Sequence, residues 1–268
     1  MYLAEFAKNN GNKYLFLKYR YASLLAASTA GAAFYPATAI FFPMRLNLYL
    51  SAEGPVPFDY LPTLKGAFHR WLGHDEALHD GLSLYSLAWL RGGRASRGGI
   101  RFPEGAQWFI SAPDTGLIHR LVSGVVRAPE IGLGLRVADV RMQAPPEFAA
   151  GEQAFRVASP VFIKHLPPEA QPGAPADHLL PGHPLADELL TATLRRKLRQ
   201  AGLDDTGATV RFDPAHIATA KTKLFHYKQV QCRSSICPVL VAGSTKQLQF
   251  AWEVGVGHST GIGCGALV

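Results

Sequence analysis

Cysteine is scarce in this chain. The 268 residues include three cysteines, Cys232, Cys237 and Cys264. Three cysteines are too few, and odd in number, for the disulfide framework of a small secreted protein, which excludes that class. Cys232 and Cys237 have four residues between them and lack a second pair, which argues against a structural zinc site. We therefore expect reduced thiols, a cytoplasmic protein and no metal centre.

Long apolar runs are also missing. The most apolar N-terminal stretch, LLAASTAGAAFYPATA (residues 24–39), is rich in alanine and is interrupted by Gly31 and Pro36. It imitates a secretory signal because it follows basic residues and ends in small ones, but its charged leader is too long. A membrane span is not expected either. We expect residues 1–39 to form an N-terminal extension docked on the fold.

Acidic residues are outnumbered by basic ones. The chain has 20 Asp and Glu against 27 Lys and Arg, a net charge of +7 and an isoelectric point near 9.4. This excess favours a polyanionic partner, either nucleic acid or an anionic membrane surface, and does not indicate a fold. With 48% hydrophobic and 18% charged residues, the chain has enough apolar material for a packed core.

In the first half of the chain, the pattern of apolar residues predicts four strands and two helices. Met44, Leu46, Leu48 and Leu50 alternate with polar residues, which is typical of a strand within residues 40–50. Strands are also predicted over 85–92, 100–112 and 133–143, and helices over 61–73 and 116–126. The order strand, helix, strand, strand, helix, strand is that of a ferredoxin-like fold.

The second half predicts another unit of the same kind after the joint QAPPEF (residues 143–148). Strands are predicted over 155–165, 223–232, 237–244 and 248–257. The intervening helix, residues 184–202, would bury a stripe of Leu185, Leu189, Leu194 and Leu198. We predict an α+β protein of two tandem ferredoxin-like (RRM-like) βαββαβ domains, residues 40–146 and 147–268, after the extension 1–39.

The chain ends in a glycine-rich stretch, GVGHSTGIGCGALV (residues 255–268). A dinucleotide-binding loop would need a helix after it, and the chain offers none. One remaining interpretation is a tight turn that closes a sheet edge. The other is a loop whose uncovered backbone N–H groups cradle a phosphate backbone. The candidate RNA contacts in this stretch are Gly255, Gly257, His258, Ser259, Gly261 and Gly263.

Three basic regions could hold RNA phosphates. The first is RGGRASRGGIR, a predicted hairpin tip with Arg91, Arg94, Arg97 and Arg101. The second is the end of the helix 184–202, with Arg195, Arg196, Lys197 and Arg199. The third follows the late strands, with Lys223, Lys228 and Arg233. The first two regions also have a structural interpretation, because a solvated turn or a helix C-terminus favours cations without any ligand.

Several loose motifs occur together in one order. They are PMRLNLYL (43–50), LPTLKGAFHRWLG (61–73), LHDGLSLYSLAWL (78–90), FRVASPVFIKH (155–165), ELLTATLRRKL (188–198) and the glycine-rich end. In this order, from about residue 40 to the C-terminus, the chain resembles the RAMP superfamily. Within it, the resemblance is to the CRISPR-associated endoribonuclease that cuts precursor CRISPR RNA inside its repeats.

The resemblance implies cleavage without a metal or other cofactor. A base removes the proton of the ribose 2′-OH, which attacks the adjacent phosphorus, and an acid protonates the 5′-oxygen leaving group. The product is a 2′,3′-cyclic phosphate or its hydrolysed form. The family places His79 on its catalytic histidine and His69 on or near a helix position where some members carry a catalytic tyrosine. His74 is a reserve candidate.

The implied partner is CRISPR repeat RNA, both precursor and mature, with retention of the repeat hairpin and contacts to other effector-complex subunits as further expectations. The chain departs from the family in one respect. Many members carry a lysine shortly after the histidine, whereas GLSLYS (81–86) has none, so Arg91, Arg94 or the glycine-rich end would replace it.

Several alternatives stay open at this point. His69 is also consistent with an exposed helix residue and His79 with a loop histidine. The whole protein is also consistent with a RAMP-fold subunit that holds processed RNA without cutting it. A protein of another class, docked to a membrane through residues 14–42, would float with anionic liposomes.

Overall fold

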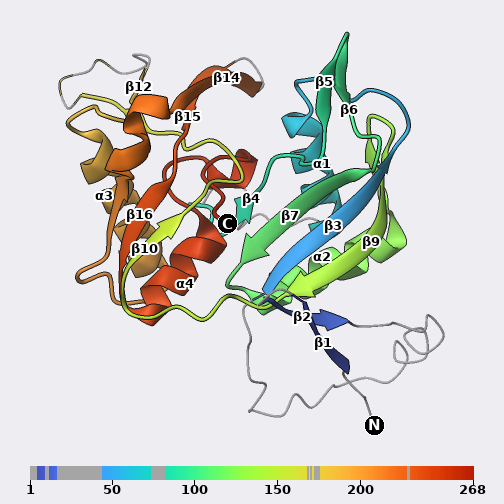
Figure 1. Ribbon diagram of the computed structural model, residues 1–268, viewed down its shortest axis with the longest axis horizontal. Coiled ribbons are helices and arrows are strands. Elements are labelled where there is room, and N and C mark those ends of the chain that lie inside the picture. The colour runs from blue at the N-terminus through green and yellow to red at the C-terminus, as the bar shows by residue number, and fades with distance from the viewer. Residues whose placement is uncertain are drawn as a thin grey trace.

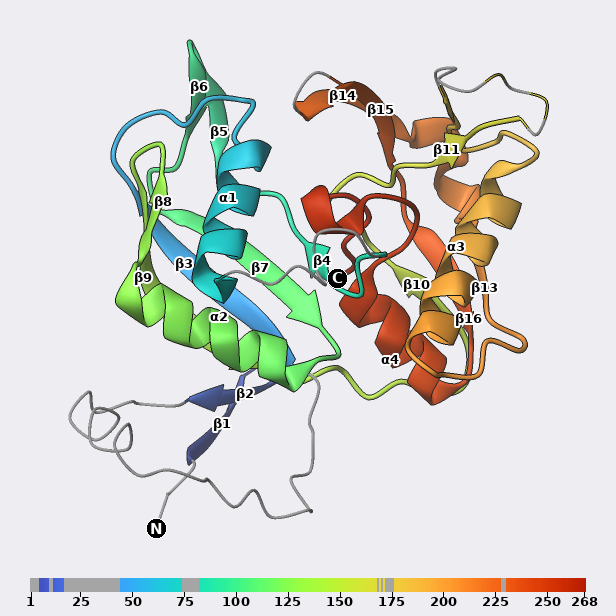
Figure 2. The same ribbon diagram turned by 180° about the vertical axis from the view of Figure 1, so that it is seen from behind.

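The computed structural model describes residues 5–9, 12–16, 44–73, 82–167, 169, 171, 176–227 and 230–268. Two α/β units lie side by side, and the C-terminus lies between them (Figures 1 and 2). None of the helices in the described ranges has the length and apolar character needed to span a bilayer.

The first unit is built on an antiparallel sheet. Its four main strands are β3 (Met44–Ala52), β4 (Ser86–Leu87), β7 (Ala106–Ala112) and β9 (Leu135–Gln143). They lie side by side in the order β9-β3-β7-β4, which is the fourth, first, third and second of these strands along the chain. Helices α1 (Leu61–Leu72) and α2 (Thr115–Arg127) both cover the face turned to the viewer in Figure 2.

Shorter strands extend this unit at its edges. β1 (Glu5–Asn9) pairs with β2 (Asn12–Phe16), which pairs with β9, and β8 (Glu130–Gly132) pairs with β9 too. β5 (Arg94–Ser96) and β6 (Gly99–Arg101) form a separate hairpin that projects from the unit (Figure 1).

Close helix packing explains one glycine of the first core. A Cβ added to Gly124 of α2 would lie 2.3 Å from the Trp71 carbonyl oxygen, so only glycine lets α2 approach α1 this closely. The apolar stripe predicted for α1 is buried as expected, at Leu61, Leu64, Phe68 and Leu72.

The second unit repeats the plan. β10 (Gly151–Phe155), β13 (Thr209–Phe212) and β16 (Val239–Gly243) form a sheet in the order β10-β16-β13, with α3 (Ala186–Gln200) and α4 (Thr245–Val254). The C-terminal residues take the place of the fourth strand, because the backbones of Arg156 and Val268 exchange two hydrogen bonds of 2.9 and 3.1 Å. Both units thus have the strand order of a ferredoxin-like fold, and the predicted fold class is confirmed.

Further elements lie outside that plan. β11 (Lys164–His165) pairs with β12 (Asp177–His178), and β14 (Lys221–Tyr227) pairs with β15 (Val230–Ile236). The 3-10 helices are η2 (Pro214–Thr219) and η3 (Thr260–Ile262).

The structure corrects three predicted elements of this unit. Residues 248–257 do not form a strand, because most of them lie in α4. The signal was Ser244, whose hydroxyl accepts from the Gln247 N–H while the Gln247 side chain accepts from the Ser244 N–H, a capping box. No single strand covers residues 155–165, because β10 ends at Phe155 and Lys164–His165 form β11. On α3, Leu190 is buried while Leu185 is exposed.

Candidate nucleic-acid interface

The glycine-rich segment, residues 255–265, is packed between the two units. Gly255, Gly257, Gly261 and Gly263 are all buried. A Cβ on Gly257 would lie 2.7 Å from the Phe162 carbonyl oxygen, and one on Gly261 would lie 2.3 Å from the Ser83 hydroxyl. The prediction that these glycines form an open cradle for RNA is therefore wrong. Their missing side chains admit other parts of the protein.

Several backbone N–H groups of the segment also donate hydrogen bonds inside the protein. Gly255 donates to the Ala251 carbonyl at 2.9 Å and Gly265 to the Pro160 carbonyl at 2.9 Å. His258 donates to the Phe162 carbonyl at 2.8 Å. A donor engaged in this way is not available to a phosphate. The surface of the segment is supplied by His258, Ser259 and Ile262, which are partly exposed.

Lys197 of α3 joins this segment to the second core. Its side chain is 1% exposed, and its ammonium donates to the Val254 carbonyl at 3.0 Å and to the Thr260 hydroxyl at 2.9 Å. The Thr260 hydroxyl in turn donates to the Tyr85 carbonyl of the first unit at 2.9 Å. The predicted contact of Lys197 with RNA is therefore wrong, because its ammonium points into the protein and holds the end of α4.

Burial of Lys197 makes the stability of the protein depend on pH. Desolvation, with a smaller effect of the Arg196 charge, lowers the pKa of Lys197 to about 7. Between that value and its ordinary pKa the unfolded chain binds one more proton than the folded one, so the free energy of unfolding increases with pH. We expect an increase of about 1.4 kcal/mol per pH unit between pH 7.5 and 10, relative to Lys197→Met. Urea unfolding of both proteins across this range measures it, and parallel pH curves would contradict it.

A buried arginine also joins the units. Arg45 of β3 is 2% exposed, and its Nη2 donates to the carbonyls of Trp252 at 3.1 Å and Leu267 at 2.8 Å. Its guanidinium lies 3.6 Å from the centre of the Trp252 ring. Trp89 Nε1 donates to the Gly263 carbonyl at 2.6 Å. These contacts place the glycine-rich segment against β4 and the residues around it.

Two of the predicted histidine positions lie outside the described residues. These are His79 and His74, together with the basic residue Lys228. The described chain resumes just after them, and Ser83 lies beside Gly261. His69 is half-buried in the last turn of α1, next to Phe68, whose ring stacks on Tyr85 at 4.7 Å. Burial raises the pKa of Tyr85.

The predicted basic residues differ in how accessible they are. The hairpin β5–β6 and its flanks expose Arg91, Arg94, Arg97 and Arg101, and the hairpin β14–β15 exposes Lys223 and Arg233. Both hairpins project to the same side of the molecule (Figures 1 and 2). On α3, Arg196 is exposed, whereas Arg195 donates to the Ala208 carbonyl at 2.8 Å and Arg199 pairs with Asp205 at 2.5 Å.

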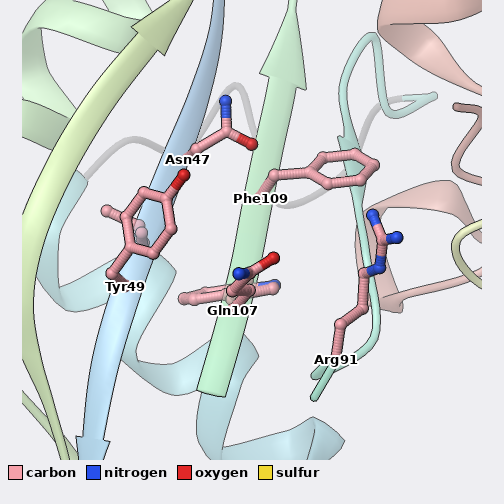
Figure 3. A pocket seen from close by; sticks show the side chains of 7 residues that line it. Asn47, Tyr49, Arg91, Gln107 and Phe109 are labelled. Atoms are coloured by element: carbon pink, nitrogen blue, oxygen red, sulfur yellow. The ribbon is translucent and has the colours of Figure 1, made fainter. Parts of the chain in front are cut away.

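The first sheet carries a small hollow on the face opposite α1 and α2. Seven residues line it, namely Leu48, Trp108 and the five labelled in Figure 3: Asn47, Tyr49, Arg91, Gln107 and Phe109. Phe109 is 3% exposed, and the Arg45 guanidinium lies 3.9 Å from its ring centre. Arg141 lies 4.5 Å from the Tyr49 ring centre and pairs with Asp139. The aromatic rings of this face are therefore already covered by arginine.

Sequence reasoning missed two basic residues of the second unit, Lys164 and His178. They face each other in the pair β11–β12. Their spacing in the sequence does not predict that they pair, because a loop separates the two residues along the chain. The part of the chain that the structure describes contains no group of three His, Cys, Asp or Glu side chains placed to hold a metal ion.

Residues 143–268 match the family model described as CRISPR associated protein Cas6, C-terminal. This region, just under half of the chain, is similar to the Cas6 C-terminal domain. The resemblance predicted from the sequence is thereby confirmed. The matched region includes α3, α4, both short hairpins of the second unit and the glycine-rich segment.

Solved structures resemble the whole two-unit arrangement. One, described as a Cas6-related gene product from Pyrococcus furiosus, has 20% sequence identity and a TM-score of 0.72 over 84% of this chain and 98% of its own. One described as an RAMP protein binding different RNA substrates has 19% identity and a TM-score of 0.72 over the same shares. A Cas6 product complex has 17% identity and a TM-score of 0.59, covering 84% and 99%. At these identities the likeness shows the fold. No curated protein matches the sequence.

Proposed function

We propose that this protein binds CRISPR repeat RNA and cleaves it within precursor transcripts without a metal ion. The observation that carries the proposal is the similarity of residues 143–268 to the Cas6 C-terminal domain. The similar fold of a Cas6 product complex and of an RAMP protein described as binding RNA supports it. The net charge of +7 suits a polyanionic substrate.

The RNA would lie on the side where the hairpins β5–β6 and β14–β15 project. Exposed cations occur on both, so a strand crossing from one unit to the other would meet positive charge at each end. The contacts predicted for Arg94, Arg97 and Arg101 on one side and for Lys223 and Arg233 on the other belong to this proposal. Single-stranded or hairpin RNA would be held mainly through its phosphates.

The chemistry would be acid–base catalysis by imidazole. In the proposal His79 removes the 2′-OH proton, and His69, on the helix that precedes it, is the second candidate for proton transfer. The sequence has no lysine in residues 81–86 to stabilise the charged phosphorane, so exposed Arg91 or Arg94 would take that part.

The experiment is a cleavage assay with end-labelled repeat RNA in excess EDTA. We expect cleavage at one position, unchanged by EDTA, with a 2′,3′-cyclic phosphate or its hydrolysed form at the new end. A matched RNA with a single 2′-deoxynucleotide on the 5′ side of the cut should stay intact, because it lacks the attacking hydroxyl. Cleavage of that RNA, or loss of cleavage in EDTA, would refute the mechanism.

One observation favours a second candidate function. The absence of lysine from residues 81–86 fits a RAMP-fold subunit that holds processed CRISPR RNA and cuts nothing. In the same assay such a subunit would retard the repeat RNA in a gel and leave it uncut.

A further inference from the structure

Four separate segments of the second unit meet near Lys164 and His178. Lys164 is directly opposite His178 in the pair β11–β12, so the two side chains lie on one face with Cβ atoms roughly 5 Å apart. His258 donates its backbone N–H to the Phe162 carbonyl, and its ring accepts from the Lys164 N–H at 3.2 Å. Arg233 of β15 donates its backbone N–H to the His178 ring at 3.3 Å.

Both imidazoles are oriented in the same way. In each, Nδ1 accepts a hydrogen bond from a backbone N–H, so the ring proton of the neutral form lies on Nε2. His178 also packs edge-on against the buried Phe162 ring at 4.8 Å, and the Lys164 ammonium lies 5.5 Å from the centre of the same ring. Each ring therefore keeps an Nε2–H donor, and both rings lie close enough to Lys164 to be affected by its charge.

The local charge is strongly positive. Desolvation and the charges of Arg196, Lys164 and Lys197 lower the pKa of His258 to about 4. Desolvation, Lys164 and Arg233 lower the pKa of His178 against the opposing charge of Asp177. Both imidazoles are therefore neutral donors near pH 7. The cations that act on the two rings, Lys164, Arg196, Lys197 and Arg233, outnumber the one carboxylate, that of Asp177.

We propose that Lys164, His178, Arg233 and His258, called the basic cluster below, bind a backbone phosphate of RNA. A phosphodiester carries one negative charge and two non-bridging oxygens. The cluster offers two cations and two imidazole N–H donors. Lys164 and Arg233 are exposed, so the chain can continue on either side of the bound phosphate. The proposal rests on the proposed function, because its ligand is RNA. It adds a phosphate-binding site that includes Lys164 and His178.

The first test removes the two cations. In Lys164→Ala/Arg233→Ala, we expect the dissociation constant for repeat RNA, measured by fluorescence anisotropy at 0.15 M salt, to rise roughly tenfold or more. The slope of log K against log salt should become shallower by about 1. The matched control is Arg127→Ala/Lys246→Ala, which removes the same charge from exposed positions on α2 and α4. A control that loses as much affinity would refute the site.

The second test removes the imidazole donors and keeps the fold. Asparagine places an acceptor near the position of Nδ1, so His178→Asn and His258→Asn keep a partner for the Arg233 and Lys164 N–H groups while losing Nε2–H. Each should weaken RNA binding roughly tenfold with an unchanged slope against salt, because no charge is lost. Unchanged affinity in both variants would refute the proposal.

The third test uses inorganic phosphate, so it does not depend on RNA processing. In NMR titrations of the full chain we expect phosphate to shift the ring signals of His178 and His258, and to shift neither in Lys164→Ala/Arg233→Ala. If phosphate shifts neither ring in the unaltered protein, the site is refuted even if the protein cuts repeat RNA. If it shifts both rings while repeat RNA is neither bound nor cut, the cluster is a phosphate site whose ligand is not this RNA, and the proposed function fails.

Discussion

His79→Ala is expected to lower the rate constant for cleavage of repeat RNA by about 100- to 10,000-fold, the usual contribution of one acid–base group. The dissociation constant for the same RNA should stay nearly unchanged, because none of the proposed phosphate contacts comes from His79. Single-turnover cleavage and anisotropy measured on the same preparations separate the two effects.

The control for this result is a histidine of the same unit to which the proposal gives no role. His119 is exposed on α2, and His119→Ala should cut at the rate of the unaltered protein. His69→Ala tests the second proton-transfer candidate in parallel. If His79→Ala cuts at full rate, the assignment of that residue is wrong, and a large loss in His69→Ala alone would move the role to α1.

Gly265→Ala is expected to lower the free energy of unfolding by about 4 kcal/mol. Gly265 has φ +61°, and an added Cβ would lie 1.9 Å from the Val256 carbonyl oxygen. A backbone atom cannot turn aside as a side chain can, so the cost of overpacking, about 1–3 kcal/mol, adds to about 1–2 kcal/mol for alanine in the left-handed region. Urea unfolding followed by circular dichroism measures the difference.

Gly207→Ala separates the two costs. Gly207 has φ +75° but nothing lies within 4 Å of an added Cβ, so only the conformational cost of about 1–2 kcal/mol applies. Equal losses in the two variants would show that the glycine-rich segment is not closely packed. A larger loss in Gly265→Ala supports close packing of Gly265 against Val256 within the glycine-rich segment.

The error about α4 has a definite physical cause. Residues 248–254 are buried on almost every side, so the sequence lacks the 3.6-residue alternation that distinguishes an amphipathic helix from a buried strand. The Ser244–Gln247 capping box was the available signal for a helix. α1 and α2 were predicted correctly because each has one buried and one exposed face.

The basic residues show what a run of charges in the sequence can predict about exposure and what it cannot. The exposed arginines of the β5–β6 hairpin and its flanks were predictable, because a glycine-rich turn has no core in which to bury them. Lys197 looked the same in the sequence, within LRRKLRQ, but its position on α3 turns it toward the carbonyls at the end of α4. A charge run does not reveal which of its members faces inward.

The sequence by itself determined the ferredoxin-like order of elements in the first unit and the Cas6 resemblance, because hydrophobic period and motif order are local properties of a chain. Only the tertiary structure decided that the terminal glycines pack between the units and that Lys164, His178, Arg233 and His258 come together. These four residues lie on segments as far apart as 94 positions along the chain, between Lys164 and His258. They are brought together by backbone hydrogen bonds between strands and loops, and these bonds cannot be predicted from the sequence.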